Sequence, residues 1–385
     1  MKKYKNSYLS YFLMYTGYYL SWALFSAMIS VYLMGKGLKA SEVSLIVSMS
    51  YLTSMAAQPV TGILTDRIGV KKMNMILFGL AAAGGVEFLF ADSFIMMLAG
   101  YSFVLTLLNA SNPMMDRIAT ASPYKYGSIR VWGTIGYAAG TQLSGLIYEY
   151  ISPAAVYAVF VITMLTGVLG TAGTEPAIET AAKDTGKKES PFVLFGNRKY
   201  LYFMLISCIM TAGTSVANTY TPAMFVEKGL PAGITSTILS LAVLCELPLV
   251  LFSYKFMDKV PNKTLIMISY TMYLIQFAVY AFDLPLPFMI AATLAAKHAA
   301  GMLYIMINLK VITTIVDRRH TMTALAFMAA SKNLVSMLSQ NIAGRMLDTA
   351  AYADVYKIYL AVMTAGWVLA YLFKVESGNE HKLFS

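Results

Sequence analysis

Long apolar runs separated by short polar turns repeat along the whole chain. Each run is close to the length of about 20 residues that an α-helix needs to cross a bilayer. Transmembrane β-strands would instead alternate apolar and polar residues over about ten positions, and these runs do not alternate. The sequence therefore predicts an all-α membrane protein with twelve transmembrane helices. The predicted segments are 8–34, 41–64, 73–91, 94–115, 127–150, 153–172, 199–225, 234–255, 263–282, 285–314, 321–347 and 352–374.

Composition and charge agree with a multi-pass protein of the cell membrane. Of the 385 residues, 58% are hydrophobic and 12% are charged, against about 25% charged residues in soluble domains. Most of the 29 Lys and Arg residues fall in alternate loops, together with the two ends of the chain. This bias predicts that both termini are cytoplasmic. Anionic lipid beside the basic loops explains the net charge of +10, so no nucleic-acid partner is expected.

The longest polar interval, 173–198, is rich in charged and small residues and is typical of a linker. It predicts an N-terminal six-helix bundle at 1–172 and a C-terminal six-helix bundle at 199–385. The turns at 62–72 and 253–263 resemble each other weakly, since in each an acidic residue is followed by basic ones. Two repeated halves with a substrate site between them are the architecture of secondary transporters.

Several ionisable residues lie within the apolar segments. A charge near the middle of a membrane helix costs roughly 2.5 to 3.5 kcal/mol, so such residues usually face a partner or a wet cavity. Two of them are near segment ends and have another interpretation, in which Arg130 extends to the headgroups and Asp116 pairs with Arg117 or Lys125. Lys332 could neutralise a buried carboxylate. The ionisable residues in question are Asp116, Arg130, Glu246, Lys297 and Lys332.

Helical spacing places further polar and aromatic residues on common faces. These stripes could line a path for a polar solute, or the tyrosines could serve helix packing and an interfacial aromatic belt. The stripes are Lys297, Gly301, Tyr304 and Asn308; Thr211, Thr214 and Asn218; and Tyr11, Tyr15, Tyr18 and Trp22.

Enzymatic functions are not expected. The sequence lacks the Gly-x4-Gly-Lys-[Ser/Thr] loop that binds ATP phosphates. It contains three histidines, of which His320 and His381 fall in loops or tails, so neither a metal site nor a histidine-based triad is expected. We therefore expect no metal and no cofactor.

Residues 57–72 carry the pattern Gly-x-Leu-x-Asp-Arg-x-Gly-x-Lys-Lys. This pattern resembles the loop between the second and third helices of the major facilitator superfamily, and it implies the major facilitator fold. Gly62 would permit close helix approach and Gly69 a tight turn, while charge contacts would hold one face closed. The other interpretation is a basic turn with no gating role. The residues assigned to the gate are Gly62, Asp66, Arg67, Gly69 and Lys71.

Within that superfamily, the chain resembles the lactose permease-like oligosaccharide:proton symporters and the related phenylpropionate-type carriers. The resemblance implies that Asp116, Arg130 and Glu246 bind sugar, that Tyr137 stacks on a sugar ring and that Lys332 balances charge. The tenth segment departs from the permeases, because it contains Lys297 and His298 but no carboxylate. The similar patches are Pro113–Asp116, Tyr126–Arg130 with Gly133, Gly136 and Tyr137, Cys245–Leu247 and Ser331–Leu334.

The predicted function is proton-coupled uptake of a small polar solute, above all a di- or oligosaccharide, by alternating access in a monomer. The presumed cavity holds more cationic than anionic side chains, which suits an organic anion. Symport of an aromatic acid and efflux of amphipathic compounds by antiport therefore stay open as alternatives. The expected proton carriers are Glu246, Asp116 and His298. The expected substrate-binding residues are Asp116, Arg130, Tyr137, Asn218, Glu246, Lys297, Tyr304 and Lys332.

Overall fold

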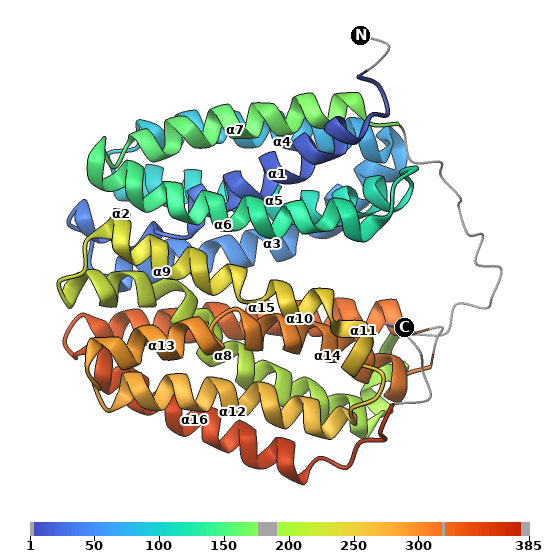
Figure 1. The fold of residues 1–385 in the computed structure, drawn as a ribbon, viewed down its shortest axis with the longest axis vertical. Helices are drawn as coiled ribbons and strands as arrows, with labels where there is room; N and C mark the ends of the chain where they lie inside the picture. Colours follow the sequence, from blue (N-terminus) through green and yellow to red (C-terminus); the bar gives the residue numbers. More distant parts are fainter. Residues whose placement is uncertain (1–3, 176–190, 318–319, 379–385) are drawn as a thin grey trace. The chain divides into compact units, whose positions relative to one another are not determined.

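The structure is a computed structural model that describes residues 4–175, 191–317 and 320–378. Within these ranges every regular element is a helix (Figure 1). The predicted all-α class is therefore confirmed for the described part of the chain.

Contacts divide the chain into two compact units. The first contains Met1–Ala181 and Thr219–Leu244, and the second contains Ala182–Asn218 and Cys245–Ser385. The predicted bundles, 1–172 and 199–385, remain a prediction. So does the linker at 173–198, most of which lies outside the described residues.

In the first unit, α1 packs against both α6 and α7, α4 packs against α5 and α7, and α3 packs against α5. Helix α1 approaches α7 closely at Gly170, where an added Cβ would collide with the backbone of Met14. A hydrogen bond of 2.7 Å between the hydroxyls of Ser21 and Thr163 joins the same two helices. The helices of this unit are α1 (Tyr8–Ser26), α2 (Ile29–Gly35), α3 (Ala40–Ile68), α4 (Val70–Leu89), α5 (Phe94–Thr120), α6 (Tyr126–Tyr150), α7 (Ala155–Gly173), the end of α8 (Arg198–Glu227) and α9 (Ala232–Leu244).

In the second unit, α12 packs against α13, α14 and α16. The Tyr270 hydroxyl of α12 donates a hydrogen bond of 2.6 Å to the Ile206 carbonyl oxygen, which joins α12 to α8. The elements of this unit are the 3₁₀ turn η1 (Pro191–Gly196), the first part of α8, α10 (Leu247–Leu251), α11 (Ser253–Phe256), α12 (Asn262–Ala281), α13 (Leu286–Ala296), α14 (Ala299–Ile315), α15 (Thr321–Leu347) and α16 (Tyr352–Leu372).

Besides the turn at Ala27 and Met28, which divides the predicted segment 8–34 into α1 and α2, two predicted continuous segments are interrupted in the structure. The segment at 234–255 breaks at Cys245 and Glu246, between α9 and α10, and the segment at 285–314 breaks at Lys297 and His298. Pro248 explains the first break, because it has no backbone N–H to continue the hydrogen-bond ladder. No proline marks the second break, so local sequence does not explain it.

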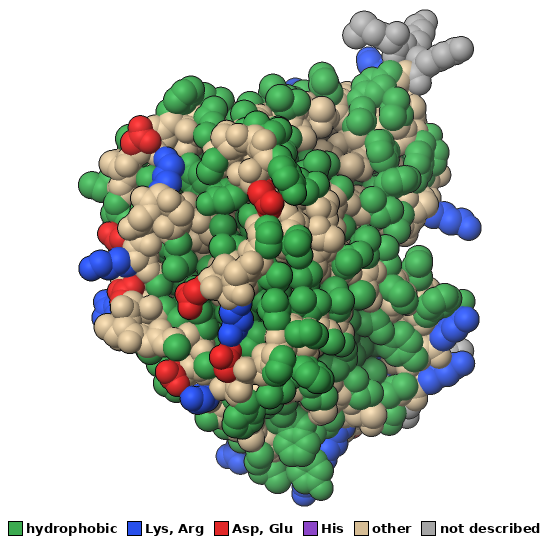
Figure 2. All heavy atoms as spheres, turned by 60° about the vertical axis from the view of Figure 1, so that its left-hand side comes forward, with side chains coloured by type: hydrophobic (Ala, Val, Ile, Leu, Met, Phe, Trp, Pro, Cys, Tyr) green, Lys and Arg blue, Asp and Glu red, His purple; other side chains and the backbone are tan. Residues whose placement is uncertain are grey.

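Ten helical stretches of the described chain are long and apolar enough to cross a membrane. Helices α6 and α15 cover the predicted fifth and eleventh segments but are not among these ten. Twelve crossings and cytoplasmic termini therefore stay predictions. Hydrophobic side chains cover most of the face drawn in Figure 2, which fits a multi-pass membrane protein.

Candidate functional site

Asp116 lies inside a helix, because α5 continues beyond the predicted end of its segment to Thr120. The hydroxyls of Tyr15 on α1 and Tyr126 on α6 both donate hydrogen bonds to its Oδ1, at 2.6 and 2.9 Å. Among the described residues, none donates a hydrogen bond to Oδ2 and none forms an ion pair with the carboxylate. Asp116 is therefore held by tyrosines rather than by Arg117 or Lys125, and one of its oxygens stays available as an acceptor.

Arg130 lies one turn into α6 and is half-buried. Its guanidinium carbon is 4.8 Å from the centre of the Tyr19 ring, in a cation–π contact. Gly133 leaves room for this contact, because a Cβ there would lie 2.8 Å from both the guanidinium and the ring. The structure gives Arg130 no hydrogen bond or ion pair to any described residue. Its five N–H donors are thus available to a ligand.

Tyr19 is a site residue that the sequence analysis missed. Its hydroxyl donates a hydrogen bond of 3.2 Å to Oδ1 of Asn112, and its ring stacks with those of Tyr15 and Trp22. The spacing of Tyr15, Tyr19 and Trp22 by four and three residues is the helical signal that could have identified this face. By contrast, Tyr18 of the predicted stripe serves packing, since it is buried and donates to the Leu108 carbonyl oxygen at 2.7 Å.

Tyr137 lies two helical turns beyond Arg130 on α6, on the same face by helical period, and it is half-buried. The structure places it along the same helix as the guanidinium, but its stacking role stays a prediction.

A second group of predicted residues meets at the two helix breaks of the second unit. Lys297 is only 7% exposed, and its Nζ donates a hydrogen bond of 2.7 Å to Oδ1 of Asn218 on α8. The neighbouring His298 places Nδ1 at 3.9 Å from Oε2 of Glu246, a residue that is 9% exposed. The breaks therefore bring together four predicted residues from separate segments of the sequence, as interrupted helices do at ion and substrate sites.

Tyr304 connects Lys332 to a polar group on α8. The Lys332 ammonium lies 5.5 Å from the centre of the Tyr304 ring. The Tyr304 hydroxyl shares a hydrogen bond of 3.0 Å with that of Ser207, which donates to Asn308 at 3.2 Å. Lys332 has no carboxylate partner among the described residues, so the expected neutralisation of a buried acid is absent from this structure.

The predicted gate differs from expectation at Gly62. An added Cβ there would meet no atom within 4 Å, so the expected close helix approach is wrong for this conformation. Gly62 and Asp66 instead line a cavity of about 380 Å³ between α3 and α5, together with Gln58, Asn109 and Arg117. Gly69 has a φ of +89° between α3 and α4, a conformation that glycine adopts readily.

Lys71 does not hold the charge contact expected of it. Its Nζ donates to the carbonyl oxygens of Ala172, at 2.8 Å, and Thr174, at the end of α7. A lysine at the C-terminus of a helix satisfies its last carbonyl groups. Asp66 and Arg67 are exposed and form no ion pair within the described chain. Lys71 is therefore a helix cap in this conformation, while gating by this turn stays a prediction.

Among the described residues, no cluster of three or more His, Cys, Asp or Glu side chains is arranged to hold a metal ion.

Comparison with known proteins identifies the family. Residues 8–329 match the model of the MFS_1 like family. The uncharacterized transporter YwbF of Bacillus subtilis (strain 168) is 26% identical over 90% of this chain and 88% of its own length. A maltose permease of Geobacillus stearothermophilus is 24% identical over 92% of both chains. A probable 3-phenylpropionic acid transporter of Escherichia coli (strain K12) is 21% identical over 76% of this chain and 80% of its own.

A solved structure, that of the nucleoside transporter NupG, superimposes with a TM-score of 0.79 at 15% sequence identity. It covers 95% of this chain and 97% of its own, which shows the fold. The predicted resemblance to the major facilitator superfamily, its sugar permeases and its phenylpropionate carriers is confirmed. The chain therefore belongs to the MFS_1 like family and is a transporter of the major facilitator type.

Proposed function

We propose that this transporter takes up a small polar solute, a di- or oligosaccharide, together with protons, by alternating access across the cell membrane. The observation that carries the proposal is the group formed by Tyr15, Tyr19, Asp116 and Arg130 in the first unit. It offers one carboxylate oxygen, a guanidinium with unused donors and several aromatic rings. A sugar has hydroxyls that donate and accept, and apolar ring faces that pack on aromatic side chains.

Each part of this group has a matching part in a sugar. Oδ2 of Asp116 would accept a hydrogen bond from a substrate hydroxyl, while Arg130 would donate to substrate oxygens. Hydrogen bonds with an ionised partner are roughly twice as strong as neutral ones, so these two residues would orient the solute. The ring of Tyr19 or Trp22 would contact a sugar face. The similarity to a maltose permease along nearly the whole chain also supports a sugar.

Proton coupling is assigned to the second unit, at the helix breaks. Glu246 and His298 are titratable groups 3.9 Å apart, and Lys297 directly precedes His298 in the break between α13 and α14. Protonation of Glu246 would change its carboxylate from a hydrogen-bond acceptor into a group that can donate toward His298, so the geometry of both breaks would depend on the proton. Asp116 is the other candidate carrier. Substrate binding by Asn218, Lys297, Tyr304 and Lys332 also belongs to this proposal.

An aromatic carboxylate is the second candidate substrate, and one observation favours it. Neither Arg130 nor Lys332 has a carboxylate partner among the described residues, and a guanidinium can bind a carboxylate with two parallel hydrogen bonds. The similarity to a probable 3-phenylpropionic acid transporter supports this alternative. Efflux by antiport is the remaining alternative. Of the three functions, it should tolerate the loss of Arg130 most readily.

A thermal-shift screen of the purified full-length protein tests the substrate class. Maltose and other oligosaccharides would be compared with 3-phenylpropionate, on the wild type, on Arg130→Ala and on Arg345→Ala. Arg345 is exposed near the end of α15, so it serves as a matched arginine control. We expect oligosaccharides to stabilise the wild type and the control but not Arg130→Ala. Stabilisation by the aromatic acid alone would refute the sugar and support the organic acid.

Coupling is tested in proteoliposomes that contain a pH-sensitive dye. Addition of the stabilising sugar outside should acidify the lumen in the wild type, because solute and proton enter together. Glu246→Gln should abolish this acidification. Sugar uptake without proton movement in the wild type would contradict proton symport.

A further inference from the structure

A cavity of about 420 Å³ opens at one end of the second unit, and none of the residues assigned to transport lines it. It is lined by the first turns of α8 and α12 and by the segment that follows α16. The lining residues are Lys199, Lys263, Phe373, Lys374, Val375 and Glu376.

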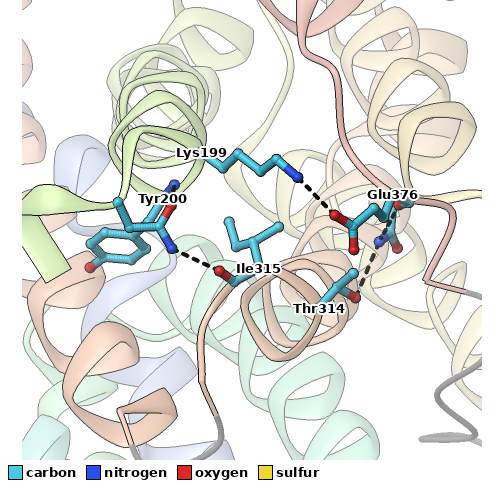
Figure 3. A network of polar contacts seen from close by, with 7 residues as sticks. Lys199, Tyr200, Thr314, Ile315 and Glu376 are labelled. Atoms are coloured by element: carbon cyan, nitrogen blue, oxygen red, sulfur yellow. Dashed lines mark hydrogen bonds and ion pairs between the residues drawn. The ribbon is translucent and has the colours of Figure 1, made fainter.

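The cavity carries an excess of positive charge. Lys199 and Glu376 form an ion pair of 2.7 Å, which Figure 3 shows. The other two lysines have no acidic partner among the described residues. Lys263 lies 4.8 Å from the centre of the Tyr371 ring in a cation–π contact, and Lys374 is exposed. Two cations are thus left to attract an anion into one small cavity.

The chain after α16 is fixed in place, so its lysine is presented at a defined position. The Asn262 side chain donates hydrogen bonds of 3.1 Å to the Glu376 carbonyl oxygen and 3.4 Å to the Thr314 hydroxyl. The backbone N–H of Asn262 donates to the Ser377 carbonyl oxygen at 3.0 Å. Figure 3 shows how Thr314 and Glu376 converge in this network. Lys374 therefore lines the cavity from an anchored segment rather than from a free tail.

The position of the cavity identifies the source of the anion. It lies at the ends of three candidate membrane spans, Arg198–Glu227, Asn262–Ala281 and Tyr352–Leu372. Trp367 and Tyr371 stack near the end of α16, and aromatic residues concentrate at the interface where lipid headgroups lie. Exposed apolar side chains continue from this end along α12 and α16, where acyl chains could run; they include Ile268, Ile275, Val368 and Leu372.

We propose that this cavity binds the phosphate group of an anionic phospholipid, with phosphatidylglycerol as the probe, through Lys263 and Lys374. Basic pockets between transmembrane helices suit anionic headgroups. Each lysine near a charged membrane surface contributes a factor of about five in affinity, so the pair contributes about 25-fold. Phosphatidylcholine also carries a phosphate, but its choline cation opposes binding next to two lysines.

The test measures binding of labelled phosphatidylglycerol and phosphatidylcholine to the full-length protein in a neutral detergent. The wild type should prefer phosphatidylglycerol, and added salt should weaken that preference. The double variant Lys263→Gln, Lys374→Gln should lose about 25-fold in affinity for phosphatidylglycerol only. Lys357→Gln is the matched control, because Lys357 is an exposed lysine in the first turns of α16. This control should bind like the wild type.

Three results would overturn the proposal. The first is equal binding of the two lipids by the wild type, which requires no variant and so does not depend on variant folding. The second is unchanged phosphatidylglycerol binding by a double variant that unfolds at the wild-type temperature. The third is displacement of the lipid by inorganic phosphate at millimolar concentration, which would assign the cavity to free phosphate.

Discussion

Replacement of Arg130 by lysine separates binding from folding at the proposed substrate site. Lysine keeps the positive charge but lacks the planar fork of five N–H donors. The structure gives Arg130 no hydrogen bond to the described chain, and its guanidinium makes a cation–π contact of 4.8 Å with Tyr19. Such contacts contribute about 0.5 to 2 kcal/mol, and lysine can retain part of it. We therefore expect the free energy of unfolding to fall by less than about 1 kcal/mol.

Binding should change much more than folding. If the substrate accepts even one hydrogen bond from the guanidinium that lysine cannot replace, about 1.5 to 3 kcal/mol is lost. That loss corresponds to a rise in Kd of about 10- to 150-fold. Isothermal titration calorimetry with the sugar that stabilises the wild type measures the Kd, and chemical unfolding without ligand measures stability.

Asp116→Asn is the comparison variant, because Asp116 accepts two hydrogen bonds from tyrosines. It should lose stability as well as affinity, since hydrogen bonds to a charged group contribute about 1.5 to 3 kcal/mol each. The reasoning would be refuted if Arg130→Lys bound sugar as tightly as the wild type. It would also be refuted if that variant lost as much stability without ligand as Asp116→Asn does.

Three further predictions concern packing, capping and coupling. Gly170→Ala should lower the free energy of unfolding by about 1 to 3 kcal/mol, whereas Gly62→Ala should be neutral or stabilising because open space surrounds Gly62. Thermal unfolding compares the two variants, and equal losses of stability would contradict the packing argument. Lys71→Met should destabilise the end of α7 by about 1 kcal/mol. Hydrogen exchange should then be faster for the amides at that end, and unchanged exchange would show that Lys71 does not stabilise it. Glu246→Gln should still exchange sugar between the two sides of a vesicle while failing to accumulate it on a pH gradient; retained accumulation would exclude Glu246 as the proton carrier.

Much of the fold followed from the period and length of apolar runs. Helices cover every predicted segment, three of them in more than one piece, because burial in lipid requires every backbone group to bond within its own helix. The breaks at Glu246 and at Lys297 did not follow. Pro248 was visible as a signal for the first, but proline is tolerated in membrane helices, so its presence alone did not decide between a kink and a break.

Only the charged residues of the candidate site could be predicted from the sequence. Asp116 and Arg130 were found because ionisable residues in apolar segments are rare. Tyr19 was missed, because a tyrosine among the many aromatic residues of the first segment is not unusual. Its importance depends on its contact with Arg130, which lies on another helix. The contacts that Lys71 makes were not predicted for a related reason, since its partners are the carbonyl groups of Ala172 and Thr174, about a hundred residues away, and the sequence shows only side chains.

The two tyrosines that share one oxygen of Asp116 have a consequence for selectivity. Because rings from α1 and α6 fix the carboxylate, its rotational freedom is lost when the protein folds rather than when a ligand arrives. A site that is already ordered favours rigid ligands, because a flexible ligand loses conformational entropy when it binds and a rigid one loses little. Between two solutes with the same set of hydroxyls, the cyclic one should therefore bind more tightly than the open-chain one.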